Sequence, residues 1–193
     1  MWDQGPATGT AVGIYWSNVY VSQSFAEQVS FASDTEVGGY NFFAFGDLSG
    51  HAGLADFRLR IFSDASGQPG SVIFTDDLAY SSAYLDGGFN TYHFDFTAQT
   101  FLAGTTYWVG MTGINFDPGQ NTLHGLAGGD DTMAQFNGGD TFSYTTSPYV
   151  GDQMFQLTGK RAAGVPDEAS TVFLTGLSLV TLAIMRRRLG ARV

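Results

Sequence analysis

Aspartate is the residue type whose positions in this 193-residue chain most readily suggest chemistry. Seven aspartates lie near Gly or Asn in segments that favour turns: Asp64, Asp76, Asp77, Asp130, Asp131, Asp140 and Asp152. Ca²⁺ binds about six to eight oxygen atoms from carboxylates and backbone carbonyls of this kind. This pattern makes calcium the one cofactor to consider, with Asp64, Asp130 and Asp131 as candidate ligands. The alternative, which we favour, needs no cofactor: aspartate suits turns, and no segment matches the EF-hand loop.

Motifs typical of enzymes are absent from the sequence. It contains no Gly-x-Ser-x-Gly elbow, no His-Glu-x-x-His helix and no glycine-rich phosphate loop with a lysine. His51, His93 and His124 are far apart in the sequence and are more typical of strand surfaces than of a metal site. Two carboxylates facing a sugar cannot be located from spacing alone. We therefore expect a protein that is not an enzyme, with a glycan-active hydrolase as the least favoured alternative.

Aromatic residues are abundant, with 17 Phe, nine Tyr and three Trp. Most alternate with polar residues and are expected in the core. Five could instead offer rings to a sugar: Tyr15, Trp16, Tyr20, Tyr84 and Tyr149. An amphipathic ring can contact the apolar face of a pyranose and hydrogen-bond its edge. This feature supports a second functional hypothesis, a carbohydrate-binding module in which calcium could take part.

The distribution of apolar residues predicts an all-β fold. Short segments rich in Val, Ile, Thr, Tyr and Phe are separated by Gly, Asp, Asn and Ser, and apolar and polar residues alternate over 57–62 and 92–96. Further strands are expected at 11–16, 27–32, 37–45, 72–78, 105–114, 133–136 and 154–158. Nine or ten such strands indicate an antiparallel β-sandwich or jelly roll, with a closed barrel as the alternative. Segment 64–70 should be a turn joining two paired strands, with Gly67 and Gly70 able to adopt positive φ.

Charge divides the chain close to residue 160. Residues 1–159 contain 16 acidic and two basic residues, a net charge of −14, whereas residues 160–193 contain six basic and two acidic residues, a net charge of +4. An acidic body of this kind repels phosphate backbones, which excludes nucleic acid as a partner. The absence of cysteine excludes disulfides and a cysteine nucleophile.

The C-terminal segment has the layout of a membrane anchor. Ala169 to Met185 is a run of 17 uncharged residues, which as a helix would span roughly 26 Å of a hydrocarbon core about 30 Å thick. The apolar residues expected to lie in the membrane are Val172, Phe173, Leu174, Leu177, Leu179, Val180, Leu182, Ile184 and Met185. Arg186, Arg187 and Arg188 follow and should hold the C-terminus in the cytoplasm. The alternative is a terminal helix docked on a soluble domain through Thr171, Thr175 and Ser178.

Val165-Pro166-Asp167, an apolar segment and an arginine cluster, in this order, resemble the PEP-CTERM class of bacterial sorting tails in its Val-Pro-Asp variant. Glu168-Ala169 replaces the Ser-Gly usual in that variant. The resemblance implies that an exosortase-type membrane protease recognises Val165, Pro166 and Asp167, with Arg186 to Arg188 as the stop-transfer signal. It also implies transient residence in the inner membrane and then delivery to the cell surface or extracellular matrix, in an exopolysaccharide or biofilm setting.

The expected organisation is a β-sandwich domain over 1–159, a linker with the sorting motif over 160–168, a transmembrane helix over 169–185 and a basic cytoplasmic tail over 186–193. Segments 64–70, 102–108 and 155–159 also resemble, more loosely, extracellular β-domains carried by such proteins. Residues 1–6 have neither the basic nor the apolar region of an export leader, so we expect Met1 to be internal to a longer reading frame, or the chain to be a fragment. The leading functional hypothesis is an exported, non-enzymatic surface protein with polysaccharide as a candidate partner.

Overall fold

The computed structural model describes residues 2–3, 14–16, 23–44, 47–86, 89–115, 123–127, 134–137, 143–145 and 152–161. All of them belong to the first of the two units into which the chain divides, Met1–Arg161 and Ala162–Val193. The sorting motif, the membrane anchor and the arginine cluster therefore lie outside the described residues. Within the described ranges, no helix has the length and apolar character needed to cross a membrane.

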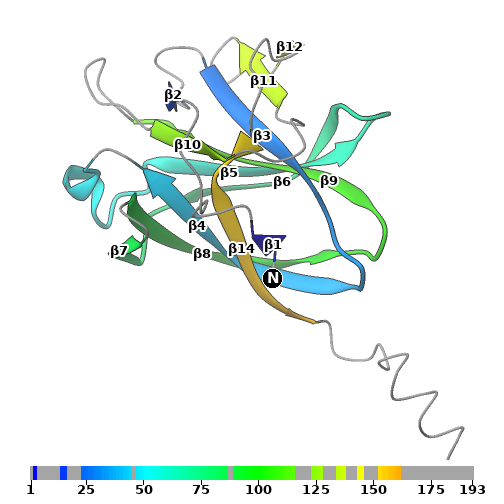
Figure 1. The fold of residues 1–193 in the computed structure, drawn as a ribbon, viewed down its shortest axis with the longest axis horizontal. Coiled ribbons are helices and arrows are strands. Elements are labelled where there is room, and N and C mark those ends of the chain that lie inside the picture. Colours follow the sequence, from blue (N-terminus) through cyan, green and yellow to red (C-terminus); the bar gives the residue numbers. More distant parts are fainter. Residues whose placement is uncertain are drawn as a thin grey trace, which may run out of the picture. The chain divides into compact units, whose positions relative to one another are not determined.

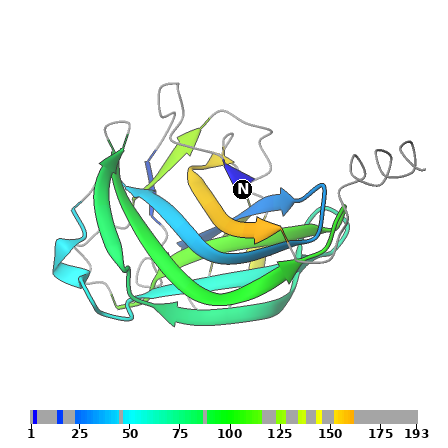
Figure 2. The same cartoon turned by 90° about the horizontal axis from the view of Figure 1, so that it is seen from below.

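Two large antiparallel sheets make up most of the described structure (Figure 1, Figure 2). The five-stranded sheet has the order β1 (Trp2–Asp3), β14 (Phe155–Arg161), β4 (Thr35–Ala44), β8 (Phe89–Phe101) and β7 (Ser82–Asp86). The six-stranded sheet has the order β12 (Ser143–Thr145), β11 (Ala134–Asn137), β3 (Gln23–Ser30), β9 (Thr106–Gly113), β5 (Phe57–Asp64) and β6 (Pro69–Leu78). A small sheet contains β13 (Asp152–Gln153), β10 (Leu123–Ala127) and β2 (Ile14–Trp16), and a 3-10 helix, η2, covers Ser49–His51. The prediction of an all-β, antiparallel fold is confirmed.

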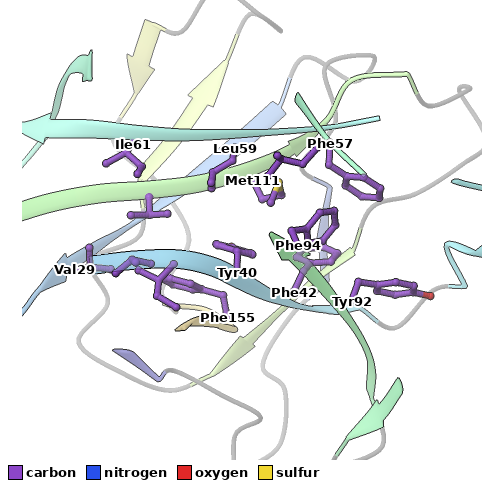
Figure 3. Packing of buried hydrophobic residues seen from close by; sticks show 14 of the residues in the cluster. Val29, Tyr40, Phe42, Phe57, Leu59, Ile61, Tyr92, Phe94, Met111 and Phe155 are labelled. Carbon is purple, nitrogen blue, oxygen red and sulfur yellow. The ribbon is translucent and has the colours of Figure 1, made fainter. Parts of the chain in front are cut away.

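The main core lies between the two large sheets (Figure 3). Leu59 and Met111 of the six-stranded sheet face Tyr40 and Phe42 of the five-stranded sheet, and all four are buried. Phe57, Leu59 and Ile61 point inward at every second position of β5, as their alternation predicts. Removal of this apolar surface from water is the dominant stabilising term.

One carboxylate is buried on the core side of the six-stranded sheet. Glu27 on β3 is opposite the core residue Val109 in the register, and its side chain accepts hydrogen bonds from the backbone amides of Gln153 (3.0 Å) and Gln28 (3.0 Å). The side-chain amide of Gln153 in turn donates to the Tyr40 hydroxyl at 3.3 Å. Burial, and secondarily the charge of Glu27, raises the pKa of Tyr40 well above its ordinary value. Glu27 thus connects β3, β13 and β4 through a polar network inside the fold.

The turn between β5 and β6 has the chemistry that its sequence predicts. Ser66 and Gly67 adopt positive φ (60° and 80°), and the Ala65 amide donates to the Gln68 carbonyl at 2.7 Å. Two consecutive positive φ angles are what a tight two-residue hairpin turn requires. Gly70, the other glycine expected to be able to adopt positive φ, instead belongs to β6.

Strand limits differ from the prediction mainly at the ends. β3 begins at Gln23, before the predicted start at residue 27, and the short strands β1, β7, β10, β12 and β13 were not predicted. β14 continues through Lys160 and Arg161, two residues past the expected end of the domain, because these residues pair with Glu36 and Thr35 of β4. Ladder pairing, which composition does not reveal, therefore determines where the last strand ends.

Candidate functional site

The pairing of β4 with both of its neighbours is interrupted at one point. The β4–β8 register shifts between Val37 and Gly39, and the β4–β14 register shifts between Thr158 and Gly159. As a result Val37 and Tyr40, three positions apart, both lie in the core. In a regular strand they would face opposite sides, so Gly38 is an additional, bulged residue relative to β14, whereas on the other side residues 96–98 of β8 lie opposite it. Bulges of this kind occur frequently beside functional sites.

The outer surface of the five-stranded sheet is hollowed at this bulge. An open depression of about 300 Å³ is lined by Glu36, Gly38, Gly39, Asp95, Ala98, Thr158 and Gly159. Three of these lining residues are glycines, so a ligand can approach the backbone closely there. The volume is at the lower end of the range for small-molecule sites. We call this feature the β4 depression.

A row of hydrogen-bonded side chains crosses three strands and ends at the β4 depression. Asn41 on β4 lies opposite both Gln156 on β14 and His93 on β8. Its amide nitrogen donates to Gln156 Oε1 at 2.9 Å, and its Oδ1 lies 2.5 Å from His93 Nδ1. His93 Nε2 lies 3.2 Å from Asp95 Oδ1. We call these four residues the polar row.

The polar row holds a charged carboxylate at the rim of the depression. The two ring nitrogens of His93 lie beside Oδ1 of Asn41 and Oδ1 of Asp95, so the ring connects these two side chains. A hydrogen bond from the Ser81 side chain, followed by the interactions with His93, lowers the pKa of Asp95 against the opposing effect of desolvation. The Asp95 side chain is nevertheless 70% exposed. It is therefore ionised at neutral pH and accessible to a ligand.

Gly39 allows the side chains of two neighbouring strands to approach each other across β4. A Cβ atom at Gly39 would overlap the Thr158 hydroxyl and would lie 2.9 Å from Cε1 of His93. At the adjacent Gly38, the nearest atom to such a Cβ is 3.4 Å away, an ordinary contact. A Cβ at Gly159 would overlap the backbone carbonyl oxygen of Glu36. Gly39 and Gly159 therefore maintain the close packing around the depression, whereas Gly38 does not.

None of these residues was predicted as part of a site. A signal was present, because glycine inside a strand marks a bulge or a close approach of backbone. Gly38 and Gly39 are such glycines inside the predicted strand 37–45, and Gly159 directly follows the predicted strand 154–158.

One residue of the predicted aromatic platform lies on the same face of the sheet. Tyr84 on β7 pairs with Thr91 on β8, two residues before His93, and it is 46% exposed. Tyr15 and Trp16 belong to β2, and Tyr20 and Tyr149 lie outside the described residues. Tyr84 is thus the member of that set that the described structure associates with the polar row.

Two of the aspartates considered for calcium binding form hydrogen bonds or an ion pair with other groups of the protein. Asp64 accepts hydrogen bonds from the Gly67 amide (3.0 Å) and from the Trp108 indole (2.9 Å), and these bonds lower its pKa. Asp77 forms an ion pair with Arg58. Among the residues that the structure describes, no three acidic or histidine side chains lie close enough together to hold a metal ion. Asp130 and Asp131 lie outside those residues, so calcium stays a prediction there.

His51 and His93, the two histidines whose side chains the structure describes, belong to separate clusters. His51 Nδ1 lies 2.8 Å from Asp56 Oδ2 in a buried pair, and the other carboxylate oxygen of Asp56 accepts a hydrogen bond from Asn115 at 2.9 Å. His93 belongs to the polar row, and the His124 side chain lies outside the described part of the chain. The His51–Asp56 pair fixes the loop between β4 and β5.

Comparison with known proteins gives no match that would assign this arrangement. No family model matches the chain, no curated protein matches it, and no solved structure matches its fold.

Proposed function

We propose that this chain is an exported, non-enzymatic protein of the cell surface or extracellular matrix that binds carbohydrate. The β4 depression is the observation that carries the binding role. A floor of glycine backbone and the methyl group of Ala98 suits the C–H face of a sugar ring, while Asp95 and Thr158 offer polar partners for its hydroxyl groups. Tyr84 extends the same face with an exposed ring.

Export by a cleavable tail is the second part of the proposal. The order of Val165-Pro166-Asp167, the uncharged segment and Arg186 to Arg188 supports it, together with the charge change near residue 160. In this proposal an exosortase-type protease cuts near the motif, and the body, a sandwich of the jelly-roll type, leaves the inner membrane for the surface or matrix.

A glycan array with the purified body tests the binding role. Gly39→Ala should abolish binding, since the new Cβ displaces Thr158 and His93, whereas Gly38→Ala should leave it within about twofold because its Cβ finds ordinary contact. Binding should not change with a chelator if calcium plays no part. An array without any bound glycan would refute the carbohydrate role.

A glycan-active hydrolase is the alternative that one observation favours, because Glu36 and Asp95 line the same depression. A glycosidase needs one carboxylic acid with a raised pKa to protonate the leaving group. The pKa of Asp95 is lowered, which argues against this residue as the proton donor. Incubation of bound oligosaccharides with the protein should release no shorter products. Release that is lost in Asp95→Asn or Glu36→Gln would establish the enzyme instead.

Intact mass of the protein from its native cell tests the export proposal. We expect loss of the tail near Val165-Pro166-Asp167 in wild-type protein and a retained tail when Pro166 is replaced by Ala. Deletion of Arg186 to Arg188 should misorient or release the chain before processing. Unchanged processing after that deletion would contradict the stop-transfer role of the arginines.

A further inference from the structure

We infer that the β4 depression prefers amino sugars with a free ammonium group over neutral and acidic sugars. This inference rests on the proposed carbohydrate site and adds the chemical class of its ligand. It follows from the hydrogen-bonding capacity of the lining, from the position of Asp95 and from the net charge of the body.

The side chains that line the depression offer more hydrogen-bond acceptors than donors. When ionised, the carboxylates of Glu36 and Asp95 can accept hydrogen bonds but cannot donate them. The Thr158 hydroxyl supplies one donor. The ligand must therefore bring the donors. An ammonium group brings three N–H donors together with a positive charge, whereas a uronic acid brings a further acceptor with a negative charge.

Asp95 is the group that would receive the ammonium. Its cross-strand partner on β4 is Gly39, which has no side chain. Asp95 is bound on one side by His93 and remains 70% exposed. An ionised carboxylate has about four acceptor positions, so it can bind His93, Ser81 and a ligand at once.

The net charge of the body acts in the same direction over a longer range. Residues 1–161 contain 16 acidic and four basic residues, a net charge of −12, and such a field attracts cationic ligands and repels anionic ones over about 8 Å at physiological ionic strength. Acidic polysaccharides are consequently disfavoured even before they contact the site. The short-range preference comes from Asp95 and should persist when salt screens the field.

The test compares two sugars that share a backbone but differ in charge, with an acidic sugar polymer as a third ligand. Isothermal titration at pH 6 would measure binding of a glucosamine hexamer, its fully N-acetylated counterpart and a polyuronate. We expect the glucosamine hexamer to bind at least about tenfold more tightly than the acetylated hexamer, as one charge-assisted hydrogen bond contributes about this much. The polyuronate should not bind.

Two pairs of variants separate the site from general attraction. Asp95→Asn keeps the shape of the side chain and should remove the tenfold preference while leaving the acetylated hexamer within about twofold. Asp77→Asn, outside the depression, removes the same charge and should preserve the preference. Gly39→Ala should abolish binding of both hexamers, whereas Gly38→Ala should not.

Each outcome decides a different point. Equal binding of both hexamers, or tighter binding of the acetylated one, would overturn the amino-sugar preference and leave carbohydrate binding intact. A preference that survives Asp95→Asn would show that the general field, and not this site, selects the ligand. Absence of binding to any sugar tested here and on the array would refute the carbohydrate role itself.

Discussion

The indole N–H of Trp108 donates to a carboxylate oxygen of Asp64 at 2.9 Å and so joins β9 to the turn between β5 and β6. The other oxygen of Asp64 accepts the amide of Gly67 at 3.0 Å, inside that turn. Trp108 is buried, so its N–H needs an acceptor that water does not provide. Asp64 therefore supports both the hairpin and the strand beside it.

Asp64→Asn should destabilise the protein at neutral pH and much less in acid. Asparagine has one acceptor oxygen for two donors, and we expect a loss of about 1 kcal/mol at pH 7, reduced from the usual range because Asp64 is partly exposed. Since the pKa of Asp64 is lowered on folding, its contribution is present above the ordinary value of 3.8 and disappears as the pH falls through the folded-state value.

Urea unfolding of the wild type and Asp64→Asn at pH 7 and at about pH 2.5 would measure this difference. Comparison of the two proteins at each pH removes the contribution of the other carboxylates, which titrate in both. An equal difference at the two pH values would contradict the assigned role of the ionised carboxylate.

Gly159→Ala should be strongly destabilising. Its Cβ would overlap the carbonyl oxygen of Glu36, and backbone must move to remove that overlap, at a cost of about 3 kcal/mol. Gly50→Ala is the matched control, because no atom lies within 4 Å of its new Cβ. Thermal or urea unfolding should show the control within about 0.5 kcal/mol of wild type. Similar losses in both variants would argue against a close approach at the bulge.

Tyr40→Phe should cost about 1–2 kcal/mol of unfolding free energy, because the buried side-chain amide of Gln153 loses the hydroxyl to which it donates. Tyr84→Phe, at an exposed position, should change the stability by less than about 0.5 kcal/mol. Urea unfolding at pH 7 gives both values. A loss as small in Tyr40→Phe as in Tyr84→Phe would show that the hydroxyl has no energetic role.

Alkaline pH should destabilise the wild type more than Tyr40→Phe. The folded-state pKa of Tyr40 is raised, so the neutral hydroxyl is retained in the fold, and stability is lost as the pH rises above the ordinary value of 10.0. The difference in unfolding free energy between wild type and Tyr40→Phe should therefore be smaller at about pH 11 than at about pH 8. Parallel curves would exclude Tyr40 as the source of the pH dependence.

The parts of the fold that follow from local chemistry could be predicted. Alternation in β5 identified its inward face, and Asp64 to Gly70 was identified as a hairpin turn from its residue types. The polar row could not be predicted in the same way. Gln156 and Asn41 are 115 positions apart in the chain and meet only through pairing of β14 with β4. Spacing along one sequence carries no direct information about such pairing.

Because of the bulge at Gly38, the shape of the outer surface can change independently of the residues that form the core. Val37 and Tyr40 point into the core on either side of the bulge, and Gly38 itself is not part of the apolar packing. An insertion or a side chain larger than alanine at this single position could change the shape of the recess while the hydrophobic interior stays constant, whereas the Cβ of alanine finds only ordinary contacts there. The bulge therefore offers a protein engineer a place to graft a binding surface without redesign of the core.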